Sequence, residues 1–308
     1  MSVTIRRLIV IVILIAAAAI GVRRNRADAG NVDQTGALWL ATINDYRTMA
    51  GVAPVTDNPR WSLAAKEHAR YMVLNGKVAV EQTEGTASTN TGATVASRAN
   101  VAGFERSDQA DGDFIDAWMA SPFHALGILR PELKRVGFGS WRDATAQPVG
   151  SAAVIDVIDG LVARTPGHST YQWPGPGSVL SQTAFRGGTL PDPLSACPAS
   201  FTPPTGLPII ATLHDGELLA NSRLMVNDTT VEHCVLSAAT YINPDSNSQR
   251  IGRAILAADD AVILVARHEF APGDRIAVSL LTSSASLNWS FGIAAGPQRP
   301  TSPASRDS

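Results

Sequence analysis

The sequence has no marked excess of charge of either sign. It holds 25 lysine and arginine residues against 27 aspartate and glutamate residues, which gives a formal net charge of -2. These charges are scattered along the chain, whereas a protein that binds nucleic acid usually gathers its basic residues in a patch or stripe. We therefore expect no nucleic-acid partner and no strongly acidic partner.

Several signatures of catalysis and metal binding are also absent from the sequence. It contains no G-x-S-x-G, no H-E-x-x-H and no glycine-rich loop of the kind that holds phosphate. Cysteine is scarce, because Cys197 and Cys234 are the two cysteines of the chain and they form no C-x-x-C pair. A redox dithiol and a cysteine zinc knuckle are thereby excluded.

The N-terminal segment "MSVTIRRLIVIVILIAAAAIGV" has the layout of an export signal. Two arginines precede an uninterrupted apolar run over residues 8–22. The run is shorter than the ~20 residues that a membrane-spanning helix needs, and "ADA" at residues 27–29 offers a cleavage site. The positive charges of "RRNR", at residues 23–26, instead favour a retained anchor. We expect residues 1–29 to be a signal peptide or a signal anchor, which leaves the rest extracytoplasmic, either secreted or held at the cytoplasmic membrane.

This predicted location bears on the two cysteines. Exported proteins fold where disulfides form and persist, so the first interpretation is a disulfide between Cys197 and Cys234. Two free buried thiols remain the alternative.

The chain between residues 33 and 160 has the pattern of helices around a small sheet. Apolar residues at helical spacing predict helices in "TGALWLATINDYRTMAG", "DNPRWSLAAKEHARYMVLNG" and "GDFIDAWMA". Ser121 and Pro122 predict the start of a short fourth helix that contains His124. The β-branched runs "RVGFG" and "AAVIDVIDG" follow as strands. We therefore expect an α+β domain over residues 33–160.

The remaining chain differs in composition and in its hydrophobic pattern. Residues 161–200 are rich in proline and glycine and predict a linker with the start of a second domain. Residues 201–295 hold short β-type runs separated by turns, which predict an all-β, immunoglobulin-like sandwich. The tail at 296–308 offers nothing to bury, and we expect it to be disordered.

Several segments, in order, resemble bacterial CAP-superfamily (SCP-like) domains. They are "NDYRTMAGVAPVTDNPRWSLAAKEHARYMVLNGK", "SRANVAGF", "DAWMASPFHALGILRPELKRVGFGSWRD" and "AAVIDVIDG". The resemblance covers about residues 33–160 and implies the α-β-α sandwich of that family. The second half resembles the β-domain that follows CAP domains in some actinobacterial exported proteins, through "WPGPG", "PDPLSACP" and "TYINPDSNSQRIGRAIL".

The resemblance also indicates where a functional cleft would lie. In CAP domains two histidines and two glutamates can converge, and in some members they hold zinc. Here Val80 stands near the first histidine position, Ala99 stands for the glutamate of a G-E-N segment, and Ser121 falls near the second glutamate position. The strand that can carry the late histidine reads "SAAVIDV". His124, the histidine of the bacterial S-P-x-H segment, is the family residue that remains.

A zinc site needs three or four nitrogen, sulfur or oxygen ligands, and these positions do not supply them. We therefore expect no metal and no cofactor, with His124 and Ser121 lining the cleft. Glu81 and Glu84 could replace the missing ligands, but solvated loop carboxylates are the simpler interpretation.

The other titratable residues are also interpreted as structural or solvent-exposed residues. His68 lies on the apolar face of the second helix and is expected to be a core histidine. His168 and His214 stand in polar, turn-like surroundings, and His233 adjoins a cysteine in a strand, so all three are interpreted as surface or structural residues. Paired carboxylates such as "IDVID" can perform acid-base chemistry when one pKa is shifted. We expect Asp156 and Asp159 to be solvated charges at a strand end instead.

Two functions from different classes are compatible with these residues. The favoured one is an exported, non-catalytic CAP-domain protein, not an enzyme, that binds an envelope component or a lipid. The alternative is a hydrolase of cell-envelope material that uses His124 with a carboxylate that the sequence does not identify. A carboxylate within hydrogen-bonding reach of His124 would favour the alternative.

Overall fold

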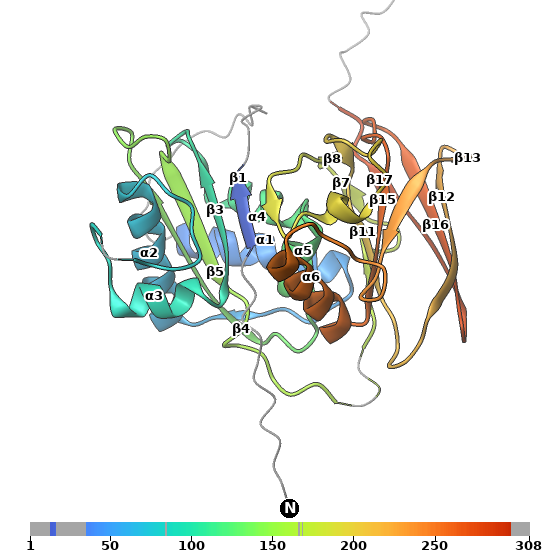
Figure 1. The fold of residues 1–308 in the computed structure, drawn as a ribbon, viewed down its shortest axis with the longest axis horizontal. Helices are drawn as coiled ribbons and strands as arrows, with labels where there is room; N and C mark the ends of the chain where they lie inside the picture. Colours follow the sequence, from blue (N-terminus) through green and yellow to red (C-terminus); the bar gives the residue numbers. More distant parts are fainter. Residues whose placement is uncertain (1–12, 17–34, 84, 166, 168, 297–308) are drawn as a thin grey trace, which may run out of the picture.

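The computed structural model describes residues 13–16, 35–83, 85–165, 167 and 169–296. The rest of the predicted signal segment, nearly all of the predicted tail, Glu84 and His168 lie outside the described residues. The described chain has a mixed α+β fold, as predicted (Figure 1). None of its described helices has the length and apolar character to cross a membrane.

The first part of the chain builds most of a sheet that lies between two layers of helices, and β9 (Thr189–Leu190) of the second part completes it. Its strands, in spatial order, are β2 (Thr56–Asp57), β4 (Arg135–Arg142), β5 (Ser151–Asp156), β3 (Ala99–Phe104), β1 (Ile13–Ala16) and β9 (Thr189–Leu190). Strands β4, β5 and β3 pair antiparallel, while β1 runs parallel to β3 and antiparallel to β9.

Helices cover both faces of this sheet (Figure 1). On one face are α2 (Pro59–Leu74) and α3 (Asn90–Ala96); on the other are α1 (Thr35–Met49), α4 (Asp111–Met119) and α5 (Pro122–Leu129). Helix α2 packs directly on the backbone of β4, where a Cβ atom at Gly139 would lie 2.1 Å from the backbone nitrogen of Lys66. Glycine is therefore required at this crossing.

Helices α2 and α5 begin where the capping residues in the sequence predict. Asn58 caps α2, because its side chain accepts a hydrogen bond from the backbone nitrogen of Arg60, and Pro59 occupies the first turn. The short fourth helix also forms as predicted, since α5 starts at Pro122 after Ser121 in the cap position. All eight residues of α5 are buried.

The second part of the chain is rich in short strands. A four-stranded sheet has the order β14 (His233–Leu236), β15 (Ala261–Ala266), β11 (Ile209–Thr212) and β6 (Gln172–Trp173). A five-stranded sheet has the order β13 (Thr229–Thr230), β12 (Leu219–Val226), β16 (Arg275–Thr282), β17 (Ser286–Ile293) and β7 (Val179–Leu180). A further pair joins β10 (Thr205–Gly206) to β8 (Ala184–Phe185).

One helix stands within the region that we expected to be all-β. Helix α6 (Ser246–Ala258) follows its cap Asp245, whose side chain accepts a hydrogen bond from the backbone nitrogen of Ser248. It buries one face, formed by Ile251, Gly252, Ile255 and Leu256. The stretch expected as a linker contains β6 to β9 and a short 3-10 helix, η1 (Pro193–Ala196).

The two parts share one apolar core. Buried side chains of α1, α4 and α5 belong to the same cluster as those of β11, β15 and β16. Buried contacts therefore cross the boundary that we predicted at residue 160. The domain limits drawn from the sequence stay a prediction.

Candidate functional site

The sequence-predicted cleft residues come together in the structure. The Nδ1 atom of His124 lies 3.0 Å from the Ser121 hydroxyl, and the Asn100 side-chain amide donates to the backbone oxygen of His124 at 3.1 Å. His124 is 0% exposed and Ser121 is 2% exposed, so solvent reaches neither side chain. The cavity on this side of the sheet is lined by their neighbours, among them Asn100, Phe123 and Gly127.

Two positions that the resemblance assigns to polar ligands hold apolar side chains in this protein, and both side chains pack in or against the core. Ala99 is buried at the start of β3, and Val80 packs against the same cluster of buried residues under α2. Glu81 is exposed. Among the residues that the structure describes, no three histidine, cysteine, aspartate or glutamate side chains gather in a way that could hold a metal ion.

His68 is a core histidine, as predicted. It is 0% exposed; its Nε2 lies 2.7 Å from the backbone oxygen of Ala79, and its Nδ1 lies 3.1 Å from the Gln82 amide nitrogen. Burial lowers the pKa of His68 to about 4, against a small opposing effect of the Ala79 hydrogen bond. A neutral ring satisfies both contacts, since Nε2–H donates to Ala79 while Nδ1 accepts from Gln82.

The prediction of a solvated charge at Asp156 is wrong. Asp156 is 1% exposed because it ends β5, which lies between β3 and β4, and it pairs with Ala99 on one side and Gly137 on the other. Its Oδ1 accepts hydrogen bonds from the backbone nitrogens of Ile158 and Asp159, at 2.9 and 3.0 Å. Its Oδ2 is buried and has no hydrogen-bond partner within the described part of the chain.

The two carboxylates of "IDVID" therefore differ in character. Burial is the main cause that raises the pKa of Asp156 to about 6. Asp159 forms an ion pair with Arg98, whose Nη1 lies 2.7 and 2.8 Å from its two carboxylate oxygens. Asp156 has the shifted pKa that acid-base chemistry requires, but its enclosed position gives no access to a substrate.

A polar cluster between the two parts of the chain was missed by the sequence analysis. Arg130, just after α5, forms a bidentate ion pair with Asp259, just after α6, with distances of 2.8 to 3.1 Å. Both side chains are 8% exposed. Nearby, Arg164 donates to Asp260 at 2.6 Å. No local pattern could have found this cluster, because Arg130 and Asp259 lie 129 residues apart.

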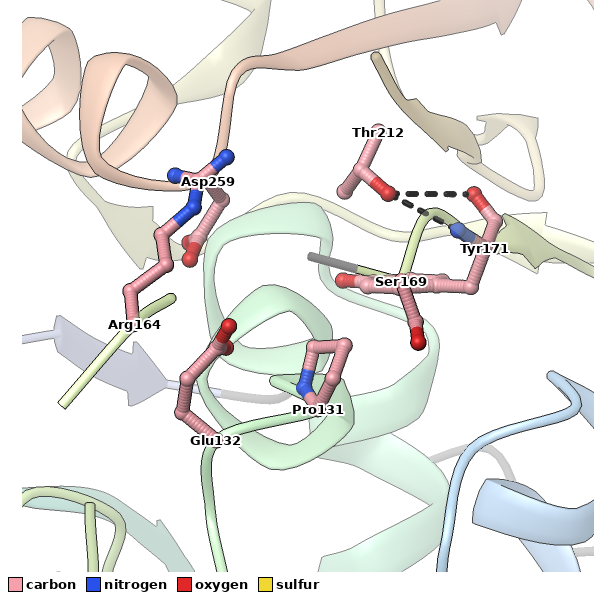
Figure 2. A pocket seen from close by; sticks show the side chains of 7 residues that line it. All are labelled: Pro131, Glu132, Arg164, Ser169, Tyr171, Thr212 and Asp259. Carbon is pink, nitrogen blue, oxygen red and sulfur yellow. Dashed lines mark hydrogen bonds between the residues drawn. The ribbon is translucent and has the colours of Figure 1, made fainter. Parts of the chain in front are cut away.

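A small cavity of about 10 Å³ lies beside this cluster. Figure 2 shows that the Tyr171 hydroxyl and the Glu132 carboxylate point toward it. The Tyr171 hydroxyl is buried without a hydrogen-bond partner among the described residues, and burial raises the pKa of Tyr171 well above its usual value. Cavities of this size hold about one water, so this cavity has no room for an organic ligand.

His214, His233 and the two cysteines lie in the second part of the chain. His233 is partly buried, with its Nε2 2.9 Å from the Ser222 hydroxyl, and His214 is exposed in a turn. The structure joins Cys197 and Cys234 by a disulfide, with an S–S distance of 2.11 Å. This is the pairing expected from the sequence, and it ties the end of η1 to β14.

Comparison with known proteins locates the family resemblance on the fold. No curated protein matches the chain. Residues 40–147 match the family model of the cysteine-rich secretory protein family, CAP. This range begins within α1 and continues past β4, so it contains His68, Ala99, Ser121 and His124, whereas both cysteines lie beyond it. Residues 40–147 therefore form a CAP-like region, and the rest of the chain lies outside this match.

Proposed function

We propose that this protein is exported and acts without catalysis, by binding a component of the cell envelope such as a lipid. The observation that carries this proposal is the burial of His124 and Ser121 within the core of the CAP domain. A general base must come within ~3 Å of the proton that it removes from a substrate. The His124 ring is 0% exposed, which argues against such a role.

The surrounding residues support the same proposal. Val80 and Ala99 are apolar at positions where related CAP domains carry ligands, so neither position supplies a metal ligand or an acid-base group. The His124–Ser121 contact links the cap position of α5 to its first turn. In this proposal the pair stabilises the turn between α4 and α5.

Export is supported by the apolar run at residues 8–22 and by the disulfide in the second part of the chain. A reporter fused after Gly30 tests this point. The proposal predicts an alkaline phosphatase fusion that is active outside the cytoplasm. A fusion that is inactive there, while a cytoplasmic reporter at the same position is active, would contradict export.

Binding is tested with the purified full chain on immobilised lipids and glycans extracted from a bacterial envelope. We expect saturable retention of one chemical class, with the His124→Asn variant retaining that class to the same extent. Retention of no class by a folded protein would contradict the binding role.

A further inference from the structure

Strand β1 fills a position between two strands that are far apart in the sequence. Its residues pair with β3 from Ile13 opposite Asn100 to Ala16 opposite Gly103, and with β9 through Leu14 opposite Leu190 and Ile15 opposite Thr189. Figure 1 shows β1 beside β3, near the middle of the molecule. Both edges of β1 are therefore paired, so β1 bridges the CAP sheet to a strand of the second part.

The same residues belong to the apolar run that the proposed function assigns to export. A segment that is cleaved off, or that inserts into a membrane, cannot remain in this sheet. In the exported protein the backbone edge of β3 over residues 100–103 and that of β9 then lose the strand between them. Unpaired strand edges of this kind are templates for another extended chain.

The position that β1 would vacate is here called the slot between β3 and β9. The residues around this slot indicate what can bind there. Val101 belongs to the buried cluster under α2, and Ala102 belongs to the cluster that includes α1 and α4, so both faces next to β3 are apolar. The groups along its two edges are backbone N–H and C=O groups, which need hydrogen-bonding partners when they are buried. A peptide backbone supplies such partners, whereas an acyl chain does not.

One buried hydroxyl adds a specificity feature. Thr189 is 3% exposed, and its Oγ1 has no hydrogen-bond partner among the described residues. Thr189 lies opposite the register position of Ile15, and cross-strand partners of an antiparallel pair share one face of the sheet. A threonine or serine at that register position can bond this hydroxyl, whereas an aliphatic residue cannot.

We propose that the slot between β3 and β9 is a strand-acceptor site that binds an extended apolar segment of a partner polypeptide, parallel to β3. This proposal rests on the export part of the proposed function, because export withdraws the chain's own strand. The preferred segment is apolar and has a threonine or serine opposite Thr189.

The test uses the full chain and a labelled peptide of residues 11–18 with added terminal lysines for solubility. In the chain, Ile15→Pro prevents its own segment from pairing, because proline removes a ladder hydrogen bond. We expect this variant to bind the peptide at least ~10-fold more tightly than the wild-type chain does, because in the wild type the chain's own segment occupies the site. Ten-fold corresponds to about 1.4 kcal/mol. Peptides with threonine or valine at the position of Ile15 form the matched pair, and threonine should bind more tightly. A peptide with proline there should not bind.

Hydrogen exchange gives a second readout at those amides of residues 100–103 that face β1, since the other amides of this stretch face β5. These amides should be protected in the wild-type chain, exchange faster in the Ile15→Pro variant and regain protection when the peptide is added. When the apolar run of the wild-type chain inserts into phospholipid vesicles, the same amides should exchange faster without any substitution. Added peptide should then restore their protection. Peptide binding that leaves these amides unchanged, or no binding by either opened form, would overturn the proposal. The reporter fusion tests export separately, so peptide binding by a chain that is not exported would contradict export alone.

Discussion

At the scale of single residues, the buried His68 makes stability depend on pH. Its pKa is about 4 in the folded chain and ordinarily 6.5, so below pH 6.5 the unfolded chain binds a proton that the folded chain does not. This residue alone should therefore lower the free energy of unfolding by up to about 3 kcal/mol as the pH falls from 6.5 to 4. In urea unfolding the His68→Gln variant should lose this contribution, so its free energy of unfolding should rise relative to that of the wild type as the pH falls from 6.5 to 4. A difference between the two proteins that stays constant over this range would contradict this.

The buried Asp156 acts in the opposite direction over nearly the same range. Its pKa is about 6 in the folded chain and 3.8 ordinarily, so between these values the folded chain holds the extra proton. Stability from this group falls as the pH rises from about 4 to 6, by up to about 3 kcal/mol, and stays low above pH 6.

The Asp156→Asn variant should therefore be more stable than the wild type at pH 7 and should gain stability from pH 4 to 6 through the remaining effect of His68. The wild type should show a shallow dependence in this window because the two effects oppose each other. Equal pH profiles for the variant and the wild type would show that Asp156 keeps its ordinary pKa.

At the scale of elements, Arg47 fixes the end of helix α5. Its buried guanidinium donates to the backbone oxygens of Ile128, Arg130, Leu133 and Ala53, so one side chain on α1 satisfies four carbonyl groups. Burial lowers the pKa of Arg47 to about 10, which leaves it charged at neutral pH.

The Arg47→Met variant keeps the apolar contacts but removes these donors, and we expect it to lose ~2–4 kcal/mol of unfolding free energy. The exposed Arg60 on α2 is the matched control, where the same substitution should cost less than ~0.5 kcal/mol. Chemical denaturation measures both variants. Equal small losses would show that the carbonyl contacts of Arg47 do not stabilise the fold.

The elements also show what a single sequence can predict. Helices α2 and α5 are found from their caps, their prolines and their apolar spacing, all of which are local signals. Helix α6 carries equally local signals in its cap Asp245 and its apolar face, but it interrupts a series of β-type runs, and we expected the region to be all-β. The burial of Asp156 depends on the strands on both sides of β5, which the sequence of β5 does not reveal.

At the scale of the whole molecule, the two parts of the chain are held together by a shared core and by the Arg130–Asp259 pair. The pair and its cavity could not be predicted, because the fold brings the two residues together from different halves. The CAP resemblance was predictable, since its motifs lie in continuous segments.

Removing one partner of this pair leaves a buried charge alone. We expect Asp259→Asn to cost ~3–5 kcal/mol, and the double variant Arg130→Met with Asp259→Leu to recover much of that loss. Calorimetry of the wild type should show one unfolding transition, because buried contacts join the two parts. Two well-separated transitions with an Asp259→Asn effect confined to one of them would contradict this coupling.

The central claim for the whole protein is that its CAP domain binds an envelope component without reacting with it. The most direct measurement is mass spectrometry of envelope lipids and glycans incubated with the folded wild-type chain and with His124→Asn. We predict that both proteins leave the same set of molecules unchanged, because the imidazole is enclosed in the core. New cleavage products that appear with the wild type and disappear with His124→Asn would contradict the claim and would identify a hydrolase.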